Sequence, residues 1–163
     1  MARASPPLLF DSFAAELRRY TATRTSRGRV TASQIRVVVL GAAVVVTFDI
    51  LASLASRRFG FAYARASFGS YLIYLGIGYF AARASASNAI GVAAVAAGIA
   101  GLVDASIGWA VSWALGPGRL PETVPLTVAR WVSTALFVVL LAAAIGAVGG
   151  IAGRRSASDV PAV

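Results

Sequence analysis

Arginines divide this chain into four long apolar segments, and this division limits its fold more than any other feature. A helix needs about 20 apolar residues to cross ~30 Å of hydrocarbon, and about 17 is near the lower limit. The shortest segment, 66–82, can cross the hydrocarbon if Arg65 and Arg83 extend their charged ends toward the headgroups. The sequence therefore predicts four transmembrane spans, at about 37–56, 66–82, 89–115 and 131–153.

Backbone hydrogen bonding decides the secondary structure of these spans. Every N–H and C=O group inside lipid must be paired within the protein, so a span is either a helix or a strand of a closed barrel. Barrel strands alternate polar and apolar residues over ~10 positions, whereas runs such as 137–141 are apolar throughout. We therefore expect an all-α fold, in which residues 35–155 form a four-helix transmembrane bundle.

The composition narrows the chemistry that the chain can perform. Hydrophobic residues make up 58% of it and charged residues 13%, against roughly 25% charged in soluble domains. It contains no cysteine and no histidine, and all 15 basic residues are arginines. Thiolate and imidazole metal sites, Ser-His-Asp triads and Schiff-base lysines are thereby excluded. We expect a protein that is not an enzyme and that holds no metal or cofactor.

The distribution of arginines predicts the orientation in the membrane. Seven of them lie in the first 36 residues, and cytoplasmic segments carry an excess of positive charge. With both termini in the cytoplasm, ten arginines lie on that side and five on the other. We expect a multi-pass protein of the plasma or inner membrane. A cleaved signal peptide is disfavoured, because its leader would be long and Asp49 would interrupt its apolar core.

The N-terminal segment 1–34 is predicted to lie along the cytoplasmic surface. Phe10, Phe13, Leu17 and Tyr20 recur at helical spacing, which indicates an amphipathic interfacial helix; docking of this helix on the bundle is the alternative. A basic linker follows it, and residues 156–163 are predicted to be a disordered tail. Arginines attract an anionic inner leaflet, and those expected to do so are Arg18, Arg19, Arg24, Arg27, Arg29 and Arg36. Because the orientation of the protein in the membrane already explains the excess of arginines, we expect no nucleic-acid binding.

Small residues are predicted to hold the helices together. Lipid tails are as apolar as leucine, so association in a bilayer depends on close packing and interhelical hydrogen bonds. Small residues recur at four-residue steps in the third and fourth segments. The candidate packing positions are Ala97, Gly101, Ala105, Gly108, Gly146 and Gly150. They serve either contacts within one chain or a homodimer through the fourth span.

Asp49 and Asp104 are the formal charges within the predicted spans. An ionisable residue near the bilayer centre costs roughly 2.5–3.5 kcal/mol on insertion scales, so both side chains are expected to face the bundle interior. Asp49 precedes Arg57 by eight residues, which is about 12 Å of helix, and Asp104 falls at a similar depth. A polar cluster of these acids with Tyr74, Tyr71 and Ser70 is therefore predicted.

Three roles for the acids remain open on sequence grounds. Each aspartic acid can be neutral and hydrogen-bonded across the bundle, which is a structural role. The pair can instead share or relay a proton or a cation. One acid can also pair with an arginine from the outer connection, such as Arg57 or Arg65.

The function expected from these observations is a small polytopic membrane protein with a structural or partner-binding role, the partner being an unidentified membrane protein. The alternative is a small proton- or cation-coupled transporter or channel-like protein that uses Asp49 and Asp104.

Overall fold

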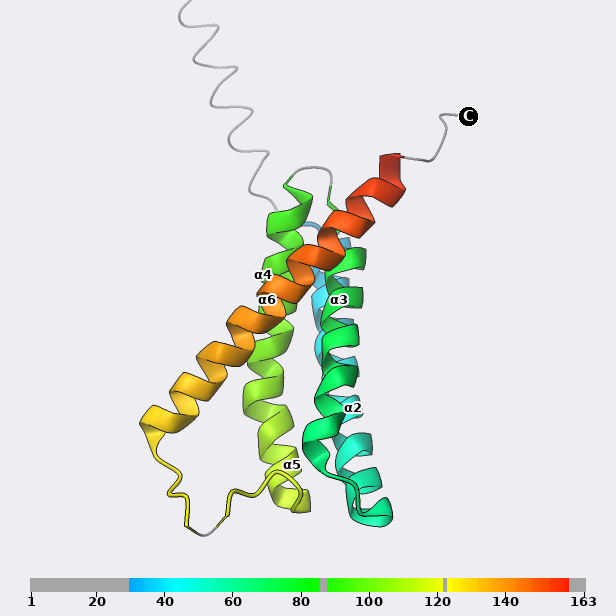
Figure 1. The fold of residues 1–163 in the computed structure, drawn as a ribbon. Coiled ribbons are helices and arrows are strands. Elements are labelled where there is room, and N and C mark those ends of the chain that lie inside the picture. Colours follow the sequence, from blue (N-terminus) through cyan, green and yellow to red (C-terminus); the bar gives the residue numbers. More distant parts are fainter. Residues whose placement is uncertain (1–29, 86–87, 122, 159–163) are drawn as a thin grey trace, which may run out of the picture. The chain divides into compact units, whose positions relative to one another are not determined.

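Helices account for all the regular structure in the residues that the computed structural model describes, which are 30–85, 88–121 and 123–158 (Figure 1). All of these helices belong to one compact unit, Ala32–Val163. They are α2 (Ala32–Phe59), a 3-10 turn η1 (Tyr63–Ala66), α3 (Ser67–Arg83), α4 (Ala89–Val103), a π-helical turn η2 (Asp104–Gly108), α5 (Trp109–Leu115) and α6 (Val128–Ser158). The prediction of an all-helical fold is confirmed for this part of the chain.

Successive helices run in opposite directions. The ribbon in Figure 1 shows α2 and α3 side by side, a continuous rod made of α4, η2 and α5, and α6 crossing in front of the others at an oblique angle. The most extensive packing is that of α6 against α4 and α3, followed by that of α3 against α4. α2 packs less extensively against α3 and α4. At 1.5 Å per residue, the 31 residues of α6 extend over about 46 Å, which suits a helix that crosses the bundle at a tilt.

In the part of the chain that the structure describes, three helices are long and apolar enough to cross a membrane. They cover Ala32–Phe59, Ala89–Leu115 and Val128–Ser156. With 17 residues, α3 is shorter than these three, so its role as a further span stays a prediction.

Helix ends depart from the predicted ends of the spans. α2 begins at Ala32 rather than at residue 37, and α6 continues to Ser158, so the first residues of the predicted tail are helical. Those ends were placed where the apolar segments end, but a helix continues into polar sequence until a breaker occurs. α2 ends before Gly60, whose φ of 71° is left-handed, and α5 ends before Gly116, whose φ is 106°.

Several predictions concern residues outside the described part of the chain. The predicted amphipathic helix falls within residues 1–29, which also include Arg18, Arg19, Arg24, Arg27 and Arg29. Residues 159–163 of the predicted tail also lie outside the described residues. Arg36 is described and is exposed near the start of α2. Its binding to an anionic leaflet stays a prediction.

Small side chains fill the centre of the bundle, and large apolar ones cover its outside. The buried cluster includes Val45, Ile77, Ala97 and Ala142. Many large apolar side chains are exposed instead, on α2, α3, α4 and α6. Examples are Leu40, Leu51, Phe68, Leu72, Val95, Leu136, Phe137 and Leu140. A soluble monomer rarely exposes so extensive an apolar surface, whereas lipid provides the matching environment.

Glycines place α6 against α3 and α4 at very short range. A Cβ atom added to Gly78 of α3 would meet the backbone carbonyl oxygen of Gly146 in α6. A Cβ on Gly149 would meet the carbonyl oxygen of Leu75, and one on Gly153 would meet that of Tyr79. α3 and α6 therefore cross with their backbones in contact, which only residues without a side chain permit.

The predicted packing positions on α6 face α4 of the same chain. A Cβ on Gly146 would meet the Cβ of Ala97, and one on Gly150 would lie 2.6 Å from the Cβ of Ala93. A Cβ on Gly101 would similarly lie 2.6 Å from the Cβ of Ala142. A homodimer through α6 would therefore use its other, exposed face, and this dimer remains a prediction.

Candidate functional site

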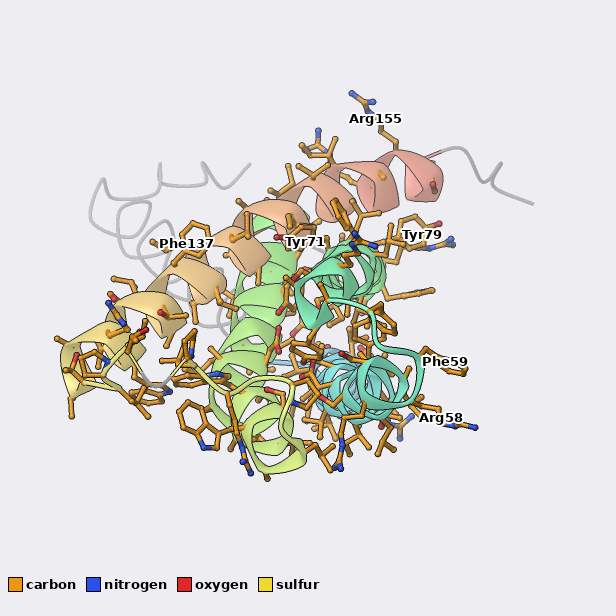
Figure 2. All side chains as sticks on the ribbon, turned by 60° about the horizontal axis from the view of Figure 1, so that its bottom comes forward. Arg58, Phe59, Tyr71, Tyr79, Phe137 and Arg155 are labelled. Carbon is orange, nitrogen blue, oxygen red and sulfur yellow. The ribbon has the colours of Figure 1, made fainter. Side chains whose placement is uncertain are left out.

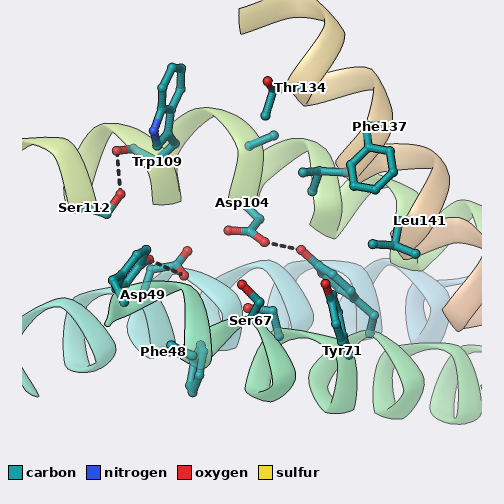
Figure 3. A pocket seen from close by; sticks show the side chains of 16 residues that line it. Phe48, Asp49, Ser67, Tyr71, Asp104, Trp109, Ser112, Thr134, Phe137 and Leu141 are labelled. Atoms are coloured by element: carbon teal, nitrogen blue, oxygen red, sulfur yellow. Dashed lines mark hydrogen bonds between the residues drawn. The ribbon is translucent and has the colours of Figure 1, made fainter. Parts of the chain in front are cut away.

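A cavity of about 320 Å³ lies among α2, η1, α3, the η2–α5 segment and the first half of α6 (Figure 3). Its walls include all five residues of the predicted polar cluster. These are Asp49, Ser70, Tyr71, Tyr74 and Asp104. The structure thus brings together side chains from three segments that are distant in the sequence.

Asp49 reaches the cavity from the middle of α2. Its side chain is buried, with a relative exposure of 3%. One carboxyl oxygen, Oδ1, accepts a hydrogen bond of 3.3 Å from the hydroxyl of Tyr63. The other, Oδ2, has no hydrogen-bond partner among the described residues, although it is fully shielded. A buried carboxyl oxygen without a partner is costly, and a proton bound at this atom would reduce that cost.

Asp104 is the first residue of the π-helical turn η2. Its Oδ2 accepts a hydrogen bond from the hydroxyl of Tyr74, a residue of α3 with a relative exposure of 1% (Figure 3). Single π turns inside α-helices occur often at functional sites. Here the turn separates α4 from α5 and carries both Asp104 and Gly108, which lie at its two ends.

The two carboxyl groups converge on Gly108. A Cβ atom at this position would meet Oδ2 of Asp49 and would lie 2.9 Å from Oδ1 of Asp104. The carboxyl groups are close enough to interact electrostatically, and two negative charges at such range disfavour each other. The pair therefore favours a shared proton or a bound cation. The sequence indicated Gly108 only as a packing residue.

Tyrosines, rather than arginines, are the hydrogen-bond partners of the two acids within the described residues. Arg57 and Arg65, which were considered as partners from the sequence, are exposed. An arginine pair with either acid is thus not the arrangement that this structure holds.

Several residues of the cavity were not identified from the sequence as part of the cluster. One of them is Tyr63, which lies in the connection between α2 and α3. Its hydroxyl reaches Asp49 because the chain folds back through η1, which no helical periodicity indicates. Aromatic side chains also line the cavity from α2, α5 and α6; they are Phe48, Trp109 and Phe137.

Tyr63 provides a spectroscopic probe of this site. Burial, reinforced by the neighbouring Asp49 carboxyl, raises the pKa of Tyr63 to about 12 from an ordinary value of 10.0. Because the folded state keeps this proton longer than the unfolded state does, Tyr63 makes folding less favourable as the pH rises from 10 toward 12. Subtracting the 295 nm titration of Tyr63→Phe from that of the unchanged protein should leave one tyrosine ionising near pH 12. A difference curve centred on pH 10 would contradict the buried position.

The described residues contain no group of three or more His, Cys, Asp or Glu side chains that could hold a metal ion. Two carboxyl groups, several hydroxyls and aromatic rings are the chemistry that this cavity offers. Proton exchange and the binding of a monovalent cation both fit such a set.

No protein-family model, curated protein or solved structure matches this chain. The geometry of the cavity is therefore the basis on which a function can be argued.

Proposed function

We propose that the chain is a small integral membrane protein that crosses the bilayer four times, with α3 as the second span. Several features of α3 support this. Its 17 residues extend over about 26 Å, and it presents Phe68, Leu72 and Phe80 outward with exposures of 60% or more. Arg83 in its last turn and Arg65 just before its first turn suit positions near the headgroups.

The alternating helix directions and the arginine distribution support placing both termini in the cytoplasm of the cell, with the connection between α5 and α6 on the opposite side. Reporter fusions test this arrangement. A fluorescent reporter at the C-terminus should be active, because it folds in the cytoplasm, and a phosphatase inserted after Arg119 should be active, because it folds outside. An active phosphatase fused to the C-terminus would contradict the cytoplasmic placement of that terminus.

The proposed activity is the binding and movement of a proton or a monovalent cation through the cavity of Asp49 and Asp104. One observation carries it: Oδ2 of Asp49 is buried beside a second carboxyl group and has no hydrogen-bond partner among the described residues. A purely structural pair would be expected to use its carboxyl oxygens for hydrogen bonds across the bundle. Intramembrane acids that face a cavity are instead typical of ion and proton pathways.

A structural or partner-binding role is the second candidate. The hydrogen bond from Tyr74 to Asp104 favours it, because this bond joins α3 to the continuous rod made of α4, η2 and α5. Asparagine can also accept such a bond, so a structural role predicts that replacing either acid by asparagine leaves the protein folded and changes no transport.

Flux measurements separate these two candidates. The purified protein is reconstituted in vesicles that contain a pH-sensitive dye, and a proton or potassium gradient is imposed. Flux is expected with the unchanged protein and should fall by about tenfold or more in Asp49→Asn and in Asp104→Asn. Ser106→Ala is the matched control, because Ser106 lies in the same π turn but hydrogen-bonds to the backbone of Leu102 at 2.6 Å. An absence of flux, or equal flux in all variants, would overturn the proposed activity.

A further inference from the structure

We propose that the cavity binds an organic ammonium ion, a monovalent cation with an aromatic or alkyl part, and that this ion enters sideways from the lipid between α3 and α6. The inference rests on the proposed cation-binding function and names the class of cation.

The polar side of the cavity fits one positive charge. Asp49 and Asp104 converge at Gly108, and Oδ2 of Asp49 lacks a hydrogen-bond donor among the described residues. A single cation placed there would relieve the repulsion between the carboxyl groups.

The other walls do not fit a bare metal ion. Hard cations such as Ca²⁺ require six to eight oxygen ligands, whereas most of this cavity is lined by aromatic and aliphatic side chains. Aromatic faces attract organic cations through their electron-rich centres. Phe48, Tyr71, Trp109 and Phe137 contribute rings to the lining from four different elements. An apolar pocket with a few convergent polar groups is also the usual form of a small-molecule site, and about 320 Å³ suits a small ligand.

The cavity opens toward the surface that α3 and α6 share. Ser67 and Tyr71 of α3 and Thr134 and Phe137 of α6 line it, and all four are exposed. Figure 2 shows Tyr71 and Phe137 on these two helices, at the side where the first half of α6 stands away from α3. The close backbone contacts of α6 with α3 at Gly146, Gly149 and Gly153 all lie in the second half of α6. In a four-span protein this opening faces lipid, so a ligand with an apolar part can reach the acids from the bilayer.

Direct binding tests the class of ligand. Benzyltrimethylammonium is titrated into the detergent-solubilised protein by calorimetry, and neopentylbenzene, its uncharged carbon analogue, is the matched ligand control. The ammonium ion is expected to bind, and its affinity should fall by about tenfold or more in Asp49→Asn and Asp104→Asn. Ser106→Ala should bind as the unchanged protein does. Equal binding of the uncharged analogue, or no binding of the ammonium ion, would overturn the inference.

Two tryptophan variants of α6 test the route by which the ammonium ion enters. Thr134→Trp adds bulk at the opening, so it should slow association of the ammonium ion in vesicles by about tenfold. Leu136→Trp places the same indole ring at an exposed residue of α6 that does not line the cavity, and it should leave the rate unchanged. Equal rates in the two variants would contradict lateral entry.

The two proposals fail in different ways. If vesicles show flux that depends on Asp49 and Asp104 but benzyltrimethylammonium does not bind, the class of ligand is wrong and the cation-coupled function stands. If neither flux nor binding depends on the two acids, both proposals are wrong.

Discussion

Gly78→Ala is expected to lower the free energy of unfolding by about 2 kcal/mol or more. Overpacking in a filled interior costs typically 1–3 kcal/mol, and more where neither neighbour can move. The added Cβ would meet the backbone carbonyl oxygen of Gly146. A backbone atom cannot rotate away as a side chain can, so α3 and α6 would have to separate. Unfolding in mixed micelles, followed by circular dichroism, measures the loss.

Gly76→Ala is the matched control for this substitution. It lies on the same helix two residues away, and a Cβ there would meet nothing within 4 Å. Both substitutions add the same helix propensity, which favours alanine by up to ~1 kcal/mol. Gly76→Ala should therefore leave the stability unchanged or raise it. Equal stability of the two variants would mean that α3 and α6 do not cross at Gly78.

Gly108→Ala is expected to abolish the proposed cation site while the fold persists. Its Cβ would occupy the space between the two carboxyl groups, and Oδ2 of Asp49 would have to move away. Because a carboxyl group can rotate, the cost falls on the geometry of the site more than on the packing of the helices. The affinity for benzyltrimethylammonium, and the acid-dependent flux in vesicles, should each fall by about tenfold or more.

Gly98→Ala serves as the control for Gly108→Ala. It lies on α4, and its Cβ would make an ordinary contact of 3.6 Å with the Cβ of Ala143. Its binding and flux should match those of the unchanged protein. If Gly108→Ala also retains both activities, the carboxyl groups do not act together at this glycine.

The helical part of the fold was predictable from the sequence, because apolar length and backbone hydrogen bonding allow few alternatives. The similar depth of Asp49, Asp104 and Tyr74 was also predictable, because it follows from helical rise. Helical rise gives depth along each helix, but it does not give the rotation of one helix against another. Whether the acids actually faced each other therefore required the structure.

Other features depend on contacts that no local pattern expresses. The π-helical turn at Asp104 arises within an apolar run that reads as continuous α-helix. The reach of Tyr63 to Asp49 depends on how the chain returns through η1. Gly146 was expected to serve helix packing, but its partner on α3, Gly78, could not be assigned from spacing alone.

α6 crosses α3 at Gly146, Gly149 and Gly153, so a rotation of α6 about this crossing would move the start of the helix. Gly146 lies 18 residues beyond Val128, the first residue of the helix, and this separation corresponds to about 27 Å. A rotation of roughly 5° about the crossing would therefore displace the first turn of α6 by about 2 Å. Such a displacement is comparable to the van der Waals radius of a methyl group. Small changes in bilayer thickness, which alter helix tilt, would thus widen or narrow the proposed approach to the acids.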